Sequence, residues 1–271
     1  MSTLFAKFRS GALSCNGEFY IHLPDKEIPF FLKDNPYYNR PTKTMILLHG
    51  YSGDCTDWLY SSAAQDFSMK YNLAIVMPSG GISFYVDKKA SGHHYCEFIG
   101  KDLVKYLRDT FNIALSKEDT YIGGLSMGAQ GASTIGLAHP EVFSKIFCMS
   151  GVAAKPSGGR SKIDLNWFGE GENLYTPGNM AGDKKLVNTK QDGWYSAKKI
   201  VEEGLERPEF YLTIGDKDFL LELTRSFKKY MDDLGYNIYY EEIPGYAHEW
   251  DFWDLKVREF LYSGCRLGVK K

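Results

Sequence analysis

From about residue 42 onward, short runs of β-branched and aliphatic residues alternate with longer segments of helical periodicity. This alternation is typical of βα units built around a mostly parallel sheet, so the predicted fold class is α/β. The runs are apolar along their whole length, as strands buried on both faces are. They predict six strands, at residues 44–48, 73–77, 120–125, 145–150, 209–215 and 237–243.

Two of the intervening segments carry their apolar residues on one face of a helix, and both are predicted to cover the sheet. These residues are Ile99, Leu103, Tyr106, Leu107 and Phe111 in the first segment, and Leu220, Leu223, Phe227, Tyr230 and Leu234 in the second. Core packing is the expected role of their aromatic side chains. The stretch up to about residue 40 resembles strands joined by turns, and is predicted to add antiparallel edge strands to the same sheet.

No linker divides the chain, so a single domain over residues 1–271 is expected. Residues 152–206 interrupt the βα rhythm: they are rich in Gly, Lys, Asn and Asp, with irregularly spaced aromatic residues. A structureless loop of this length is unusual inside a compact domain. The segment is therefore predicted to be a partly helical, cap-like insertion over the active site.

The charges of the chain nearly balance, with 32 basic and 34 acidic side chains and a net charge of -2. This balance leaves no electrostatic footprint for nucleic acid or for an anionic membrane, and favours a small-molecule partner. No apolar run reaches the length of a signal-peptide core or a membrane span, which predicts a cytoplasmic protein. A homo-oligomer is compatible with these features. The five cysteines are scattered without metal-ligand spacing, so reduced thiols and no metal site are expected.

The segment Gly124–Gly128 has the sequence Gly-Leu-Ser-Met-Gly and matches the G-x-S-x-G nucleophile elbow. In such an elbow a sharp strand-to-helix turn presents the serine hydroxyl above the sheet. The context agrees, because a predicted strand ends at Leu125 and a run of small residues follows Met127, which lets a helix approach the sheet closely. Ser126 is therefore the candidate nucleophile.

A serine at its ordinary pKa is a weak nucleophile and needs a base, most often a histidine oriented by a carboxylate. With this elbow the chain order is Ser, then Asp or Glu, then His. His139 lies too close to Ser126, so His248 is the candidate base. Asp216 and Asp218 both follow the strand at 209–215. Local position favours Asp218 as a helix cap and Asp216 as the freer side chain, and the residues alone leave the choice open.

Acyl transfer also needs donors for the developing oxyanion. The backbone N–H of Met127, directly after the nucleophile, is one candidate. The N–H of Tyr51 is the other, because it follows the strand that ends in His49-Gly50. His49 itself is expected to be a structural hydrogen-bonding residue and not a base.

Several stretches together resemble the esterase D and tributyrin esterase family of α/β-hydrolases, which includes S-formylglutathione hydrolases and some feruloyl and acetyl xylan esterases. They are Leu47–Gly53 with Trp58 downstream, Met77-Pro78 followed by Ser83–Asp87, Gly123–Gly128, Gly215–Leu220, and Pro244–Trp250 with Phe252–Asp254. The resemblance implies an α/β-hydrolase fold, with a mostly parallel central sheet flanked by helices. It also implies that the acid is the aspartate directly before Phe-Leu, which is Asp218, with Asp216 as the fallback.

Two departures from the family pattern bear on the substrate. The family has Gly-Gly-Tyr-Gly after Ser-Met, whereas Gly128–Gly131 reads Gly-Ala-Gln-Gly, which alters the floor of the pocket. Ser52–Cys55 also lacks the Thr-Cys pair that tends to follow the oxyanion loop in S-formylglutathione hydrolases. This second departure weighs against a glutathione thioester.

The predicted function is hydrolysis of short-chain carboxylic esters through an acyl-enzyme, with no cofactor. Trp167 and Phe168 are the candidates for the wall that limits the acyl chain, with Trp58 beneath, although these aromatic residues could equally anchor the insertion to the body. The alternatives are an S-formylglutathione-type thioesterase, a peptidase, and a feruloyl or acetyl esterase acting on carbohydrate esters. A hydrolase fold that only binds ligands is the non-enzymatic alternative.

Overall fold

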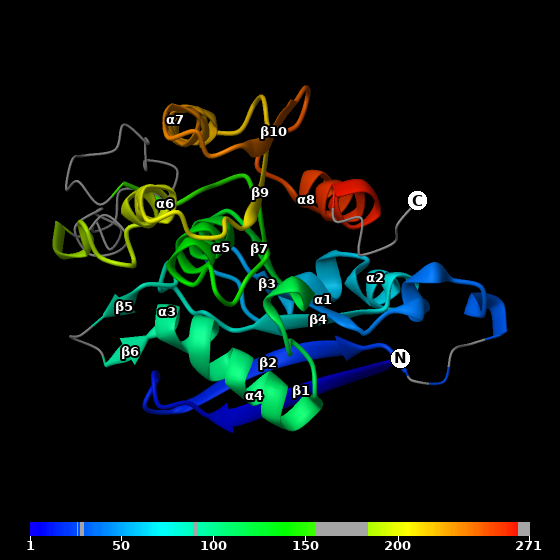
Figure 1. Ribbon diagram of the computed structural model, residues 1–271. Coiled ribbons are helices and arrows are strands. Elements are labelled where there is room, and N and C mark those ends of the chain that lie inside the picture. Colours follow the sequence, from blue (N-terminus) through cyan, green and yellow to red (C-terminus); the bar gives the residue numbers. More distant parts are fainter. Residues whose placement is uncertain (26, 28–29, 89–91, 156–183, 265–271) are drawn as a thin grey trace.

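The computed structural model describes residues 1–25, 27, 30–88, 92–155 and 184–264 (Figure 1). Its main feature is an eight-stranded sheet with the order β1-β2-β4-β3-β7-β8-β9-β10. The strands are β1 (Ser2–Arg9), β2 (Asn16–Leu23), β3 (Lys43–Leu48), β4 (Leu73–Pro78), β7 (Thr120–Leu125), β8 (Lys145–Met149), β9 (Glu209–Gly215) and β10 (Ile238–Ile243). The short strands β5 (Asp87–Lys88) and β6 (His93–His94) form a separate antiparallel pair.

The six strands from β3 to β10 in this sheet run parallel, and each lies within one residue of its predicted bounds. β1 pairs antiparallel with β2, and β2 pairs antiparallel with β4, so the N-terminal stretch forms edge strands of the same sheet as predicted. The mostly parallel sheet brings the carboxyl ends of β7, β8, β9 and β10 to one edge. In open α/β sheets, ligand sites lie outside this edge.

Helices cover both faces of the sheet (Figure 1). They are α1 (Asp57–Ser61), α2 (Ala64–Tyr71), α3 (Tyr95–Glu97), α4 (Val104–Phe111), α5 (Met127–Ala138), α6 (Gly193–Glu202), α7 (Leu221–Asp233) and α8 (Trp250–Glu259). The two amphipathic segments predicted from sequence correspond to α7 and to α4 with the π-helical turn Phe98–Leu103 before it. Within the described residues, no helix combines the length and the apolar character that crossing a membrane requires.

The core is divided by the sheet into two clusters, because successive side chains of a strand point to opposite faces. In β3, Ile46 belongs to the cluster that contains residues of α4, α5, α6 and α7, whereas Leu47 belongs to the cluster that contains residues of α1, α2 and α8. Both side chains are at most 1% exposed. A strand flanked in this way must be apolar at every position, which explains the continuous apolar runs in the sequence.

The second half of the segment predicted as an insertion, residues 152–206, contains α6. This helix follows the N-cap Asp192, whose carboxylate accepts hydrogen bonds from the first-turn N–H groups of Trp194 and Tyr195. It packs against α5 as the crossover helix between β8 and β9. That the rest of the segment caps the active site stays a prediction, because residues 156–183 lie outside the described part of the chain.

Candidate active site

Ser126 occupies a sharp turn between β7 and α5. Its backbone has φ 53° and ψ -118°, a conformation that residues with a side chain rarely adopt. The turn is held from both sides: the Ser126 N–H donates to the Met149 carbonyl at 2.9 Å, and the Ser126 carbonyl accepts from Gln130 N–H at 3.1 Å. Strain of this kind persists only where the surrounding structure imposes it, and such sites are often functional.

The two glycines of the G-x-S-x-G pattern permit this turn by close packing. A Cβ atom on Gly128 would lie 2.3 Å from the carbonyl oxygen of Leu48, and one on Gly124 would lie 2.5 Å from the backbone carbon of Gly128. Side chains at either position would therefore push α5 away from β3. The elbow predicted from sequence is present, with Ser126 partly exposed at the carboxyl end of β7.

His49 organises the loop that follows β3. Its Nε2 accepts a hydrogen bond from Gly80 N–H at 2.8 Å, so Nδ1 carries the proton and donates to the Gly50 carbonyl at 2.7 Å. Burial lowers the pKa of the His49 imidazole, which keeps the ring neutral. Both ring nitrogens are thus engaged by the backbone, in agreement with the structural role expected for this histidine.

Asp218 and His248 form a hydrogen-bonded pair at the same edge of the sheet. Asp218 lies in the turn after β9, and His248 lies in the loop between β10 and α8. His248 Nδ1 lies 2.9 Å from Asp218 Oδ2, with the aspartate side chain fully buried and the histidine side chain 15% exposed. Because Nδ1 faces the carboxylate, Nε2 is the ring nitrogen left for chemistry.

The Asp218 carboxylate keeps its charge in spite of its burial. Burial by itself raises the pKa of this carboxyl. The hydrogen bond and charge of His248 act in the opposite direction, as do donors from Leu220 N–H, at 2.9 Å, and from the Ser150 hydroxyl. The net result is a pKa below the ordinary value for aspartate.

The neighbouring Asp216 is exposed and has a different partner. Its Oδ1 accepts the Gly245 N–H at 2.8 Å, which ties the loop after β10 to the loop after β9. From their local positions in the sequence, Asp218 was the expected helix cap and Asp216 the freer side chain. In the structure Asp218 has both kinds of contact, because Oδ1 accepts Leu220 N–H while Oδ2 faces His248.

Ser150 and Trp253 are two further residues of this site that the sequence reasoning missed. Ser150 is fully buried directly after β8, and its Oγ accepts a hydrogen bond from Trp253 Nε1 at 2.9 Å. The Trp253 ring also packs edge-on against the His248 ring, with 5.0 Å between centroids. The sequence did contain a signal for Ser150, because it is a polar residue at the carboxyl end of a strand predicted to be buried.

The residues proposed from sequence for substrate contact lie in two different settings. Trp58 is 1% exposed, and its Nε1 donates to the Leu48 carbonyl at 3.1 Å, so its indole is part of the core beneath the loop after β3. Trp167 and Phe168 lie outside the described residues. The acyl wall therefore stays a prediction.

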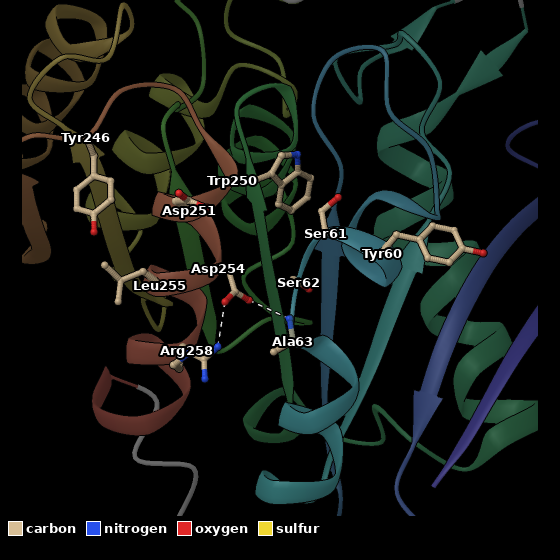
Figure 2. A pocket seen from close by; sticks show the side chains of 10 residues that line it. All are labelled: Tyr60, Ser61, Ser62, Ala63, Tyr246, Trp250, Asp251, Asp254, Leu255 and Arg258. Atoms are coloured by element: carbon tan, nitrogen blue, oxygen red, sulfur yellow. Dashed lines mark hydrogen bonds and ion pairs between the residues drawn. The ribbon is translucent and has the colours of Figure 1, made fainter.

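A pocket of about 620 Å³ lies between α1 and α8 (Figure 2). Its lining is aromatic and polar, and consists of Tyr60, Ser61, Ser62, Ala63, Tyr246, Trp250, Asp251, Asp254, Leu255 and Arg258. Asp254 accepts the Ala63 N–H at 2.9 Å, which joins the two sides, and pairs with Arg258 on the same helix at 3.0 Å. Neither Ser126 nor His248 lines it, so this pocket is not the place of the reacting atoms.

The strand order, the helices on both faces and the serine elbow define the chain as an α/β-hydrolase. The family described as "Putative esterase" matches residues 10–260. An acetyl esterase of Caldicellulosiruptor saccharolyticus is 34% identical over 260 residues, which cover 95% of this chain and 96% of that protein. The chain belongs to this esterase family and is a carboxylesterase.

Solved structures share the fold at lower identity. The S-formylglutathione hydrolase FrmB of Staphylococcus aureus superposes with a TM-score of 0.78 at 24% identity, covering 96% of this chain and 97% of that one. A ferulic acid esterase of Anaeromyces mucronatus superposes with a TM-score of 0.65 at 15% identity, covering 97% and 90%. The family resemblance inferred from sequence motifs is thereby confirmed.

Proposed function

We propose that the protein hydrolyses short-chain carboxylic esters through a triad of Ser126, His248 and Asp218, with an acyl-enzyme intermediate. The observation that carries the proposal is the hydrogen bond from His248 Nδ1 to the buried carboxylate of Asp218, at the sheet edge where the strained elbow presents Ser126. The acetyl esterase relative supports acetate as an acyl group.

In the first half of the reaction, Ser126 Oγ attacks the ester carbonyl while His248 Nε2 takes its proton. The tetrahedral intermediate collapses, the C–O bond to the alcohol breaks, and the proton passes from His248 to the departing oxygen. Water then attacks the acyl-enzyme by the same route and releases the acid. Asp218 holds the imidazole with Nδ1 protonated and stabilises the imidazolium while it exists.

The oxyanion is stabilised by two backbone donors, Met127 N–H and Tyr51 N–H. Met127 is the first residue of α5, and the N–H groups of a first helical turn have no acceptor within the helix. Tyr51 follows the glycine whose carbonyl is held by His49. Each such donor contributes on the order of 3 kcal/mol to transition-state stabilisation.

The proposed preference for short acyl groups depends on Trp167 and Phe168 as the wall. A methylene discriminates by only about 1–3 kcal/mol in an apolar pocket, so kcat/KM should decline steadily over a few carbons once the wall is reached. A Trp167→Ala variant should move the optimum to longer acyl chains. An equal loss on all chain lengths, or a wild-type preference for long chains, would show that the wall lies elsewhere.

The proposal is tested with p-nitrophenyl acetate and a serine-directed fluorophosphonate. Ser126→Ala should lower kcat by about 10⁴-fold or more with an unchanged fold, and the adduct should map to Ser126. Ser133→Ala is the matched control, since the buried Ser133 hydroxyl donates to the carbonyls of Ala129 and Gln130 within α5. An adduct at another residue, or no hydrolysis by the wild type, would refute the proposal and favour a binding role.

A further inference from the structure

Ser150 is held in an unusual backbone conformation between two strands. It follows β8 with φ 54°, and its N–H donates to the Thr213 carbonyl of β9 at 2.9 Å. A residue with a Cβ at such a φ is under strain, and the strain persists only because the surroundings impose it. Ser150 is also completely buried, so its hydroxyl must find partners inside the protein.

Both hydrogen-bonding functions of this hydroxyl are directed at the site. A hydroxyl can donate one hydrogen bond and accept others. Ser150 Oγ accepts a hydrogen bond from Trp253 Nε1 at 2.9 Å, and the Ser150 hydroxyl faces the Asp218 carboxylate, whose pKa it helps to lower. Trp253, Ser150, Asp218 and His248 are therefore linked in one series of contacts behind the proposed base.

Trp253 contacts both ends of this series of residues. Its indole N–H is the first donor, and its ring packs edge-on against the ring of His248 at 5.0 Å. Trp253 itself is 6% exposed on α8. The same side chain therefore restrains the hydroxyl behind the acid and the imidazole in front of it.

We infer that Ser150 and Trp253 are positioning residues of the esterase, which hold the Asp218 carboxylate in the orientation that His248 requires. The inference rests on the proposed triad. The groups that face Asp218 are the His248 imidazole, the Leu220 N–H and the Ser150 hydroxyl. Ser150 is the side chain among them that takes no part in the chemistry, so its removal alters the orientation of the acid without removing a reacting group.

The first test compares Ser150→Ala with Ser150→Gly. Both variants lack the hydroxyl, but glycine has no Cβ penalty at this positive φ, so Ser150→Gly should be at least as heat-stable as Ser150→Ala. In both, kcat on p-nitrophenyl acetate should fall by about 10- to 100-fold, with KM within about twofold, because a hydrogen bond to a buried charge is lost. The acid limb of the kcat/KM profile should move to higher pH, since the carboxylate loses a donor that favours its ionised form.

The second test separates the indole N–H from the ring. Trp253→Phe keeps an aromatic ring against His248 but removes the donor to Ser150, so kcat should fall by several-fold. Because both variants break the same series of contacts, the double variant with Ser150→Ala should be little worse than Ser150→Ala alone. Trp250→Phe is the matched control on the same helix, since its ring packs against Trp58 and Trp253, and its kcat should stay within about twofold of the wild type.

Three results would overturn the inference. Both Ser150 variants could keep more than half of the wild-type kcat with an unmoved acid limb. Activity could instead follow heat stability, with Ser150→Ala impaired and Ser150→Gly normal, which indicates a role in folding alone. The inference would also be wrong if the losses of kcat in Ser150→Ala and Trp253→Phe were fully additive in the double variant. Failure of the triad itself is read separately, from the activity of Ser126→Ala.

Discussion

Two hydrogen-bonded pairs, each with a carboxylate as the acceptor, differ in their setting. In the buried pair, Asp218 Oδ2 lies 2.9 Å from His248 Nδ1, with side-chain exposures of 0% and 15%. In the exposed pair, Arg225 on α7 binds Glu242 on β10 through two hydrogen bonds of 2.7 and 2.8 Å, with exposures of 47% and 28%. The exposed pair is the shorter of the two and has the better geometry.

Geometry therefore does not predict which pair matters for function. Water and salt screen an exposed pair, so its contribution to stability is small even when it is bidentate. The buried carboxylate, by contrast, can keep its charge only with specific donors around it. Those donors, at Leu220, Ser150 and His248, also fix its direction. Because the buried carboxylate needs these donors, burial gives the pair a defined orientation.

The largest expected effect that separates the pairs is on catalysis. Asp218→Asn should lower kcat on p-nitrophenyl acetate by about 10⁴-fold, because the amide favours the wrong tautomer of His248. Asp216→Asn is the matched control two residues away, and should lose only the tie to Gly245, with a much smaller loss of activity. Equal or reversed losses would transfer the role of the acid to Asp216.

A second expected effect is on the pH dependence of stability. The pKa of Asp218 is lowered in the folded protein, so the contribution of the buried pair is fully present above the ordinary aspartate pKa and is lost as pH falls through the folded value. The difference in free energy of unfolding between the wild type and Asp218→Asn should therefore shrink on acidification. Urea unfolding at a series of pH values measures it, and a difference independent of pH would contradict the assignment.

The smallest expected effect is at the exposed pair. Two hydrogen bonds from Arg225, with one from Tyr240, lower the pKa of Glu242 to about 2. Arg225→Gln should raise that pKa toward the ordinary glutamate value while kcat changes by less than about twofold. An NMR titration of the Glu242 carboxyl measures the shift. A large loss of kcat in this variant would remove the contrast between the two pairs.

Much of the scaffold follows from local patterns in the sequence. The six parallel strands were predicted to within one residue, because a strand buried on both faces must be apolar throughout. The elbow was predicted because Gly124 and Gly128 leave room that no other residue would leave. The order Ser, Asp, His followed from the same elbow, and His248 was the histidine that satisfied it.

The assignment of the acid shows where local reasoning ended. Asp216 and Asp218 stand two residues apart in one turn, and helix-capping chemistry alone favoured Asp216 as the freer side chain. The family resemblance favoured Asp218. The tertiary structure brings Asp218 to His248 and turns Asp216 toward Gly245, because the loop after β10 packs across the turn after β9.

The sequence by itself determined the strands and the elbow, since each depends on residues close together in the chain, and it determined the candidate base through the chain order that the elbow implies. Only the tertiary structure decided which buried groups surround the acid. Ser150 and Trp253 are 103 residues apart, and their hydrogen bond exists because β8 and α8 meet beside the turn that carries Asp218. A buried charge selects its donors by their position in space, and no local pattern in the sequence records that position.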